Sequence, residues 1–169
     1  MNYLLPLIAV ILGYILALVI QPKKKSNLKL LLAFSGSFLL SVTVISLLPE
    51  VYETKNTTIG LYIMLGILFQ IILEFFSKGA EHGHVHGHQT ITHIPWLLFI
   101  SLCIHALLEG FPVGHHHDLA IGIAIHHLPI AIILTTFFVQ AQLNKKAIFA
   151  FMITFAMMTP LGTLASNYI

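Results

Sequence analysis

The sequence predicts an all-α fold, a polytopic membrane helix bundle with six transmembrane helices. The chain is 57% hydrophobic and 8% charged, with a mean hydropathy of +0.93, which exceeds what a soluble domain can bury beneath a polar surface. Its apolar runs are 18 to 22 residues long, the length at which a helix crosses ~30 Å of hydrocarbon. We therefore expect a single membrane domain over residues 1–169, with spans at residues 3–20, 28–48, 58–76, 94–113, 119–139 and 147–168.

The lysines predict the orientation of these spans. Lys55 alone lies in a loop of even number, whereas the other seven basic residues lie at loops one, three and five: Lys23, Lys24, Lys25, Lys29, Lys78, Lys145 and Lys146. Because lysine-rich loops stay in the cytoplasm, both chain ends are expected outside, in the plasma (cell inner) membrane. No lysine precedes the first span, as it would in a cleavable signal peptide. No basic patch interleaved with aromatic residues points to nucleic acid.

The first three spans carry few polar groups. Span one has no charged residue. Span two contains several serines, which favour close helix packing over a pathway-lining role, and Pro49 is expected to end it. Span three is interpreted as apolar until Glu74, which lies near Lys78 and is typical of an interfacial residue with a solvated head.

A histidine-rich cytoplasmic loop is expected at residues 77–93. Its imidazoles alternate with small residues at His82, His84, His86 and His88. This composition is associated with loose metal binding, and a polar linker whose histidines have no role is the alternative.

Span four contains an ionisable pair at helical spacing. His105 and Glu109 lie four residues apart, so they share one helix face and can hold one ion between them. An ionisable residue deep in a membrane helix costs roughly 2.5 to 3.5 kcal/mol on insertion scales, so its presence requires a partner, a pathway or a metal. Gly110 and Pro112 follow and are expected to loosen the backbone hydrogen bonds just beyond the pair.

Span five brings two more histidines to a similar depth. His126 and His127 lie just before Pro129, which removes one helical hydrogen bond beside them. Counted from the outer surface at 1.5 Å per residue, Glu109, His105 and His126 all lie roughly 8 to 14 Å deep. Spans four and five can therefore bring these side chains together.

The outer turn between spans four and five is also rich in histidine. It reads His115-His116-His117-Asp118. The three imidazoles are interpreted either as a cation-collecting entrance or as a solvated turn. Asp118 is expected to cap the helix that follows, because a carboxylate accepts the unpaired N–H groups of a first turn.

Three imidazoles and a carboxylate at one depth predict a metal site. Without a metal, each would be a costly buried polar group. Imidazole with carboxylate suits Zn²⁺, and also Fe²⁺ or Mn²⁺. The expected ligands are His105, Glu109, His126 and His127, and the accessory candidates are His82, His84, His86, His88, His115, His116 and His117.

These motifs resemble those of the ZIP (Zrt/Irt-like) family of divalent metal transporters. The similar pieces are His105-Ala106-Leu107-Leu108-Glu109-Gly110 and Ala124-Ile125-His126-His127-Leu128-Pro129. The histidine-rich loop, Leu48-Pro49-Glu50 in span two and Thr159-Pro160-Leu161-Gly162 in span six agree with the family.

The resemblance implies a carrier that takes Zn²⁺ or Fe²⁺ into the cytoplasm through a site between spans four and five. It implies His105, Glu109 and His126 as the primary ligands. It also implies that a bundle including spans one, four, five and six moves against a scaffold containing spans two and three.

The chain departs from the family pattern in three places. Ala106 stands where many members have asparagine, and Ile130 stands where a second acid or histidine is usual. A second metal position would rest on Glu109 and His127 alone, so one metal is expected. The family normally has eight spans and the last two are missing here, so we expect a shortened form, a fragment, or a scaffold completed by a homo-oligomer or a second chain.

Two other function classes remain open. A haem-ligating membrane electron carrier would use His105 with His126 or His127 as axial imidazoles, although Glu109 beside them is unexpected. A metal-dependent membrane enzyme would activate water at an open coordination position. No nucleophile or general base stands out beyond the expected ligands, so no enzyme activity is expected. The sequence also lacks a G-x-x-x-x-G-K-[ST] phosphate loop, which argues against ATP hydrolysis by this chain.

Overall fold

The computed structural model of the chain describes residues 2–20, 25–54, 56–77, 94–114 and 116–168. Within these ranges the chain is helical and has no strand, so the prediction of an all-α membrane helix bundle is confirmed. The elements are α1 (Leu4–Ile20), α2 (Lys25–Val42), the π-helix η1 (Thr43–Leu47), α3 (Leu48–Glu53), α4 (Ile59–Ser77), α5 (Trp96–Gly110), the 3₁₀-helix η3 (Phe111–Gly114), α6 (His117–Gln140) and α7 (Lys145–Ser166).

These elements form apolar helical rods that follow one another along the chain. Five are long and apolar enough to cross a membrane, by length and composition: Leu28–Glu53, Ile59–Phe76, Trp96–Gly114, His117–Gln140 and Lys145–Ser166. α1 is also apolar but has 17 residues, which is the lower end of the range for a spanning helix. The exact boundaries of the six spans stay a prediction. The histidine-rich loop falls almost wholly outside the described residues.

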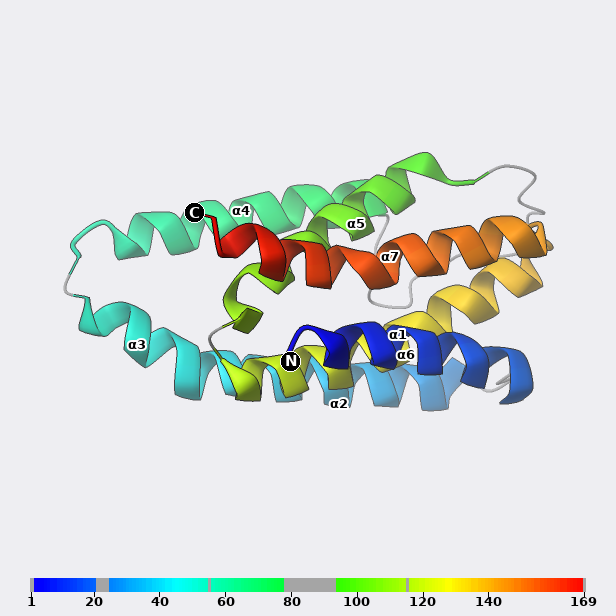
Figure 1. The fold of residues 1–169 in the computed structure, drawn as a ribbon, viewed down its shortest axis with the longest axis horizontal. Coiled ribbons are helices and arrows are strands. Elements are labelled where there is room, and N and C mark those ends of the chain that lie inside the picture. The colour runs from blue at the N-terminus through cyan, green and yellow to red at the C-terminus, as the bar shows by residue number, and fades with distance from the viewer. Residues whose placement is uncertain (1, 21–24, 55, 78–93, 115, 169) are drawn as a thin grey trace.

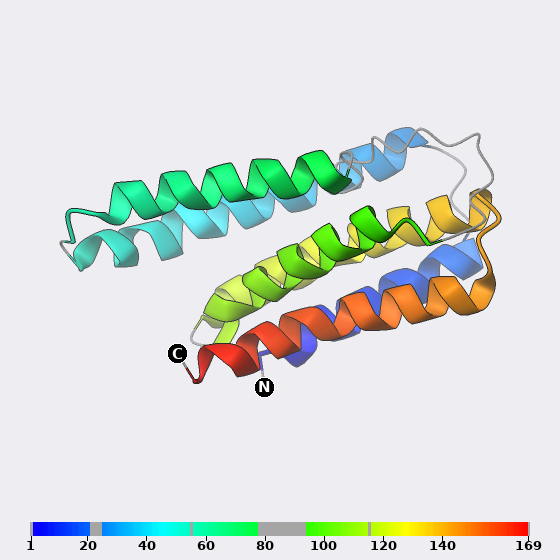
Figure 2. The same cartoon turned by 90° about the horizontal axis from the view of Figure 1, so that it is seen from above.

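The rods are arranged in layers. Figure 2 shows α2, α3 and α4 on one face, α1 and α7 on the opposite face, and α5 and α6 between them. The backbone contacts agree with this view, because α6 packs against α1 and α2 while α5 packs against α7 and α4. Successive rods run in opposite directions, so both chain ends lie toward the same end of the bundle (Figure 1).

α6 is the central helix of the bundle. Of its span, 67% is buried, against 11% for the span through α2 and 11% for the span of α4. Phe138 of α6 packs on Phe151 of α7 with ring centroids 4.7 Å apart, and Ile130 and Leu134 are buried beside them. The middle of α6 is therefore packed against its neighbours on several sides. His126 and His127 lie just before this buried stretch.

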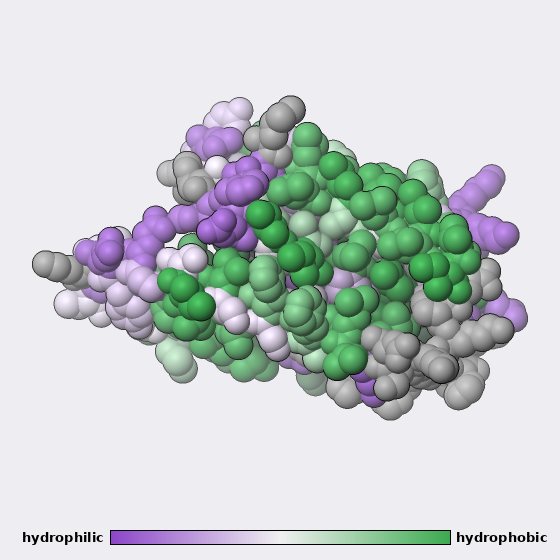
Figure 3. Space-filling view, turned by 90° about the horizontal axis from the view of Figure 1, so that it is seen from below, coloured by the Kyte–Doolittle hydropathy of each residue, from purple (hydrophilic) through white to green (hydrophobic). Residues whose placement is uncertain are grey.

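The outer surface is that of a membrane protein. On the face seen in Figure 3, hydrophobic side chains cover the middle of the molecule and hydrophilic ones gather toward its ends. Large apolar side chains such as Ile45 of η1 and Phe75 of α4 are exposed. Lipid tails are as apolar as these side chains, so contact with the bilayer removes the cost of their exposure to water.

Two glycines set how closely α5 approaches α7. A Cβ on Gly162 would collide with the carbonyl oxygen of Leu107, and a Cβ on Gly110 would collide with the carbonyl oxygen of Thr159. Thr163 fastens the same contact, because its Oγ1 donates to the carbonyl oxygen of Gly110 at 2.8 Å. The end of α5 that follows Glu109 is thus held directly against α7.

The prediction that Pro49 stops the second helix was wrong. The rod continues through η1 and α3 to Glu53. Pro49 lies in the first turn of α3, where its missing N–H costs least, and the wider turn of η1 comes just before it. The proline therefore marks a change in helix type within one rod.

Candidate metal-binding site between α5 and α6

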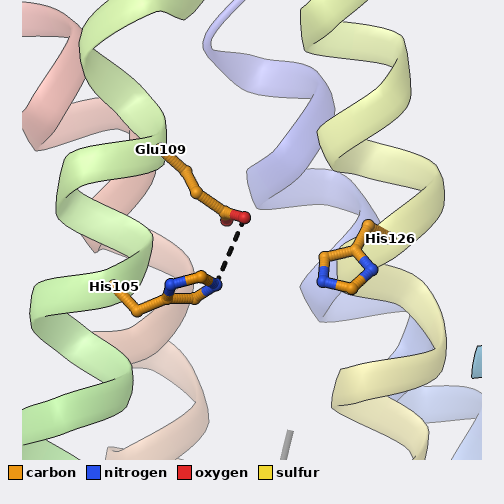
Figure 4. A group of neighbouring side chains, drawn as sticks. All are labelled: His105, Glu109 and His126. Carbon is orange, nitrogen blue, oxygen red and sulfur yellow. Dashed lines mark ion pairs between the residues drawn. The ribbon is translucent and has the colours of Figure 1, made fainter. Parts of the chain in front are cut away.

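The expected ligands meet between the two central helices. α5 carries His105 and Glu109 one turn apart, and α6 carries His126 and His127. Among the described elements, α5 and α6 have few close backbone contacts with each other. One ligand atom from each of His105, Glu109 and His126 lies within 4.8 Å of the other two. Figure 4 shows these three side chains, two from α5 and one from α6.

Glu109 lies at the centre of this group. Its Oε1 is 3.2 Å from Nε2 of His105, and its Oε2 is 2.8 Å from Nε2 of His127. The Glu109 side chain is 14% exposed. A carboxylate removed from water is costly unless charge or hydrogen bonds compensate it. Glu109 has an imidazole at each oxygen, so both oxygens are held in fixed directions.

Gln70 of α4 lies within hydrogen-bonding distance of His105. The side-chain oxygen of Gln70 is 2.9 Å from Nδ1 of His105. An amide oxygen only accepts hydrogen bonds, so Nδ1 carries the proton and a neutral His105 has its lone pair on Nε2. That lone pair faces Oε1 of Glu109, which is also an acceptor. Nε2 of His105 and Oε1 of Glu109 lie 3.2 Å apart, a spacing that suits either a proton on Nε2 or a metal ion between them.

His126 completes the group from α6. Its Nδ1 is 3.5 Å from Oγ of Ser35 on α2, at the outer limit of hydrogen-bonding distance. The Ser35 hydroxyl donates to the carbonyl oxygen of Leu32 at 2.9 Å, so its oxygen can accept from Nδ1–H. In Figure 4 the ring of His126 presents its other edge toward His105 and Glu109. Nε2 is then the nitrogen nearer the site.

The spacing of the group can be compared with that of a bound ion. Zn²⁺ binds imidazole nitrogen and carboxylate oxygen at ~2.1 Å, which puts two ligand atoms of a tetrahedral ion about 3.4 Å apart. His105 and Glu109 already have that spacing at 3.2 Å. The ligand atoms of the full group all lie within 4.8 Å of one another. The donor set of two imidazoles and one carboxylate fits Zn²⁺ with one position left open.

His127 lies behind Glu109 and outside this group of three. Its side chain is 1% exposed, and its ring packs on Phe155 of α7 with centroids 5.4 Å apart. With Nε2 directed at Glu109, the imidazole has its other nitrogen buried without a hydrogen-bond partner among the described residues. The structure therefore brings all four expected residues together, with His127 contacting the carboxylate.

The outer-turn histidines lie apart from this group. Nδ1 of His116 is 3.6 Å from Oε2 of Glu50, and Nδ1 of His117 is 3.1 Å from Oδ1 of Asn2. Both histidines line a pocket of about 200 Å³ with residues of η1, α2 and α6. The remaining accessory candidates lie outside the described residues: His82, His84, His86, His88 and His115.

The prediction that Asp118 caps the following helix was wrong. α6 begins at His117, its N-cap is His116, and no side chain makes a capping hydrogen bond there. The helix starts two residues earlier than expected, so Asp118 lies inside its first turn. A carboxylate in the first turn still favours the helix, because it lies near the positive end of the helix dipole.

Sequence reasoning missed Gln70 and Ser35. Span three was interpreted as apolar until Glu74, although Gln70 lies one turn before Glu74 on the same helix face. Ser35 was placed among the serines of a packing helix. A lone amide in an apolar run was the available signal for Gln70, whereas no pattern separates Ser35 from its neighbouring serines.

Comparison with known proteins gives a partial similarity. Neither a protein-family model nor a solved structure matches the chain. Zinc transporter ZIP1 of Danio rerio is 25% identical over 110 residues, which cover 51% of this chain and 36% of that protein. The match thus spans about a third of the length of that relative.

Proposed function

We propose that this membrane protein binds a divalent cation between α5 and α6 and carries it across the bilayer. The observation that carries the proposal is the close approach of Nε2 of His105 to Oε1 of Glu109, at 3.2 Å, with a ligand atom of His126 in the same group. Such a group in a membrane helix bundle needs a cation to balance it. The similarity to a zinc transporter supports the same conclusion.

The ligands in this proposal are His105, Glu109 and His126, with His127 as a fourth candidate beside the carboxylate. Zn²⁺ is the first choice of substrate, because imidazole and carboxylate are both common zinc ligands. Fe²⁺ and Mn²⁺ accept the same donors and are the alternatives. The open fourth position suits an ion that must leave again.

The proposed direction of transport is into the cytoplasm. The lysine distribution supports both chain ends outside, and the structure has both ends toward one end of the bundle. An inside-negative potential favours entry of a cation by roughly 2.3 kcal/mol per charge per 100 mV. Uptake of a divalent ion then needs no nucleotide motor, and we assign no catalytic step to these residues.

The same site disfavours the haem alternative. Two axial imidazoles bind iron from opposite sides of a porphyrin, so the ring must lie between them. The carboxylate of Glu109 lies within 4.8 Å of the ligand atoms of both His105 and His126, where the ring would have to lie. A small ion fits this arrangement and a porphyrin does not.

Zinc binding and zinc uptake test the proposal separately. Purified protein in detergent should bind one Zn²⁺ per chain, and His105→Ala or His126→Ala should abolish tight binding because each removes one of three ligands. The same variants in proteoliposomes should lose zinc uptake. His117→Ala, at the outer turn, is the matched control and should bind zinc as the wild type does. Unchanged zinc binding in His105→Ala would overturn the assignment of the site.

A further inference from the structure

We propose that Gln70 of α4 is a positioning residue for the metal, acting through His105. This inference rests on the proposed metal site and goes beyond it, because Gln70 comes from an element outside the two helices that supply the ligands. The contact that carries it is the 2.9 Å hydrogen bond from Nδ1 of His105 to Oε1 of Gln70.

The hydrogen bond fixes two properties of His105. It holds the proton on Nδ1, so the lone pair for a metal is on Nε2. It also fixes the rotation of the ring, since the hydrogen bond and the metal ligand are on opposite sides of the imidazole. Partners of this kind orient metal-binding histidines in many proteins, and their loss typically costs 10- to 100-fold in metal affinity.

The position of Gln70 is unusual for a residue that serves packing alone. The described part of α4 is mostly exposed, and its exposed side chains around Gln70 are apolar, including Phe69, Ile71 and Ile72. An amide among such residues is costly in a membrane unless it finds a partner. Gln70 is only partly exposed, and the structure directs its oxygen at His105 on α5.

The contact also connects the metal site to α4. α4 packs on α5, and the Gln70 to His105 hydrogen bond crosses that interface. A displacement of α4 that breaks the hydrogen bond releases the ring of His105 and lets the proton move between its two nitrogens. Metal affinity therefore depends on the packing of α4 against α5.

Zinc affinity of the full chain in detergent tests this inference, measured by competition with a chelating dye. Gln70→Leu should weaken zinc binding 10- to 100-fold, because it removes the acceptor while keeping an apolar side chain of similar size. Gln70→Glu keeps an acceptor at the same position and should restore affinity to within a few fold of the wild type. Gln140→Leu makes the same change at an exposed position near the end of α6 and should have no effect.

A second measurement reports on His105 directly. Nitrogen NMR of histidine-labelled, zinc-free protein distinguishes the two tautomers, and His105→Ala identifies the signal. The wild type and Gln70→Glu should have His105 protonated on Nδ1, and Gln70→Leu should lose that preference. Helix content and elution volume in detergent, unchanged in all variants, exclude misfolding as the cause of a weaker affinity.

The outcomes separate this inference from the proposed function. If the wild type binds no zinc, the proposed site itself fails. If the wild type binds zinc, His105→Ala abolishes binding, and Gln70→Leu binds as the wild type does, the site stands and the positioning role of Gln70 is overturned. Loss of zinc affinity in both Gln70→Leu and Gln70→Glu would also contradict the positioning role, because Gln70→Glu keeps the hydrogen-bond acceptor for His105.

Discussion

The two oxygens of Glu109 have different partners, and His127 holds the one that faces away from His105. Nε2 of His127 is 2.8 Å from Oε2, and the ring of His127 is fixed by burial and by Phe155. The other oxygen, Oε1, lies 3.2 Å from Nε2 of His105. α6 thus supplies one histidine to the group of three and one that orients the carboxylate.

This arrangement predicts the effect of His127→Phe. The substitution keeps an aromatic ring against Phe155 but removes the hydrogen bond to Glu109, so zinc affinity should fall by about 10- to 100-fold. Stoichiometry should stay at one zinc per chain. Titration in detergent measures both quantities. Two zinc ions per wild-type chain at the central site, falling to one in the variant, would instead identify His127 as a ligand of a second metal.

Glu109→Gln should be more damaging than any change of an orienting residue. The amide has nearly the same shape as the carboxylate but lacks its charge, so a divalent ion between two imidazoles is left uncompensated. We expect loss of more than about 100-fold in zinc affinity, beyond the range typical of orienting partners. Glu53→Gln, at the exposed end of α3, is the control and should leave affinity unchanged. Equal affinities in the two variants would argue against Glu109 as a ligand.

Ser35→Ala should have a smaller effect on zinc affinity. The 3.5 Å contact between Ser35 and His126 is long, so its loss should weaken binding only a few fold. Ser37→Ala is the matched control, because the Ser37 hydroxyl donates to the carbonyl oxygen of Ala33 within α2 and lies on an exposed face. Titrations of the two alanine variants side by side test this, and an equal response would remove Ser35 from the site.

Gly162→Ala should destabilise the fold. The added Cβ would collide with the carbonyl oxygen of Leu107, and overpacking of this kind typically costs 1 to 3 kcal/mol. Gly66→Ala provides the opposite case, since a Cβ at Gly66 meets no atom within 4 Å and alanine favours a helix by roughly 0.5 to 1 kcal/mol. In detergent, the midpoint of thermal unfolding should therefore be lower for Gly162→Ala than for the wild type. For Gly66→Ala it should be unchanged or higher. A stable Gly162→Ala would mean that α5 and α7 can separate at little cost.

The fold class could be predicted from sequence because hydropathy and length are local properties. An apolar run of about 20 residues has few structures available in lipid other than a helix. Helix ends were harder to predict. Pro49 was expected to end a helix that continues, and Asp118 was expected to precede a helix that already includes it. Both errors came from applying single-residue rules where the neighbouring turns decide.

The site could be predicted in part. His105 and Glu109 had to share a helix face because they are four residues apart. His126 and His127 are consecutive, so their side chains point about 100° apart. The sequence of span five does not indicate which of the two faces His105 and Glu109 and which faces Phe155. Gln70 belongs to a helix whose contact with α5 is a property of the whole bundle, and a single sequence carries no direct signal of it.

The π-turn of η1 has a consequence for the C-terminal end of the second rod. The N–H of Leu48 donates to the carbonyl oxygen of Thr43, five residues back, which amounts to one extra residue inserted into an α-helix. One residue corresponds to about 100° of rotation, so this insertion sets the angular phase of everything that follows it. With that phase, Glu50 is turned toward His116, 3.6 Å away. Removal of a single residue from Thr43–Leu47 would rotate Glu50 away from His116 while leaving the composition of the rod almost unchanged.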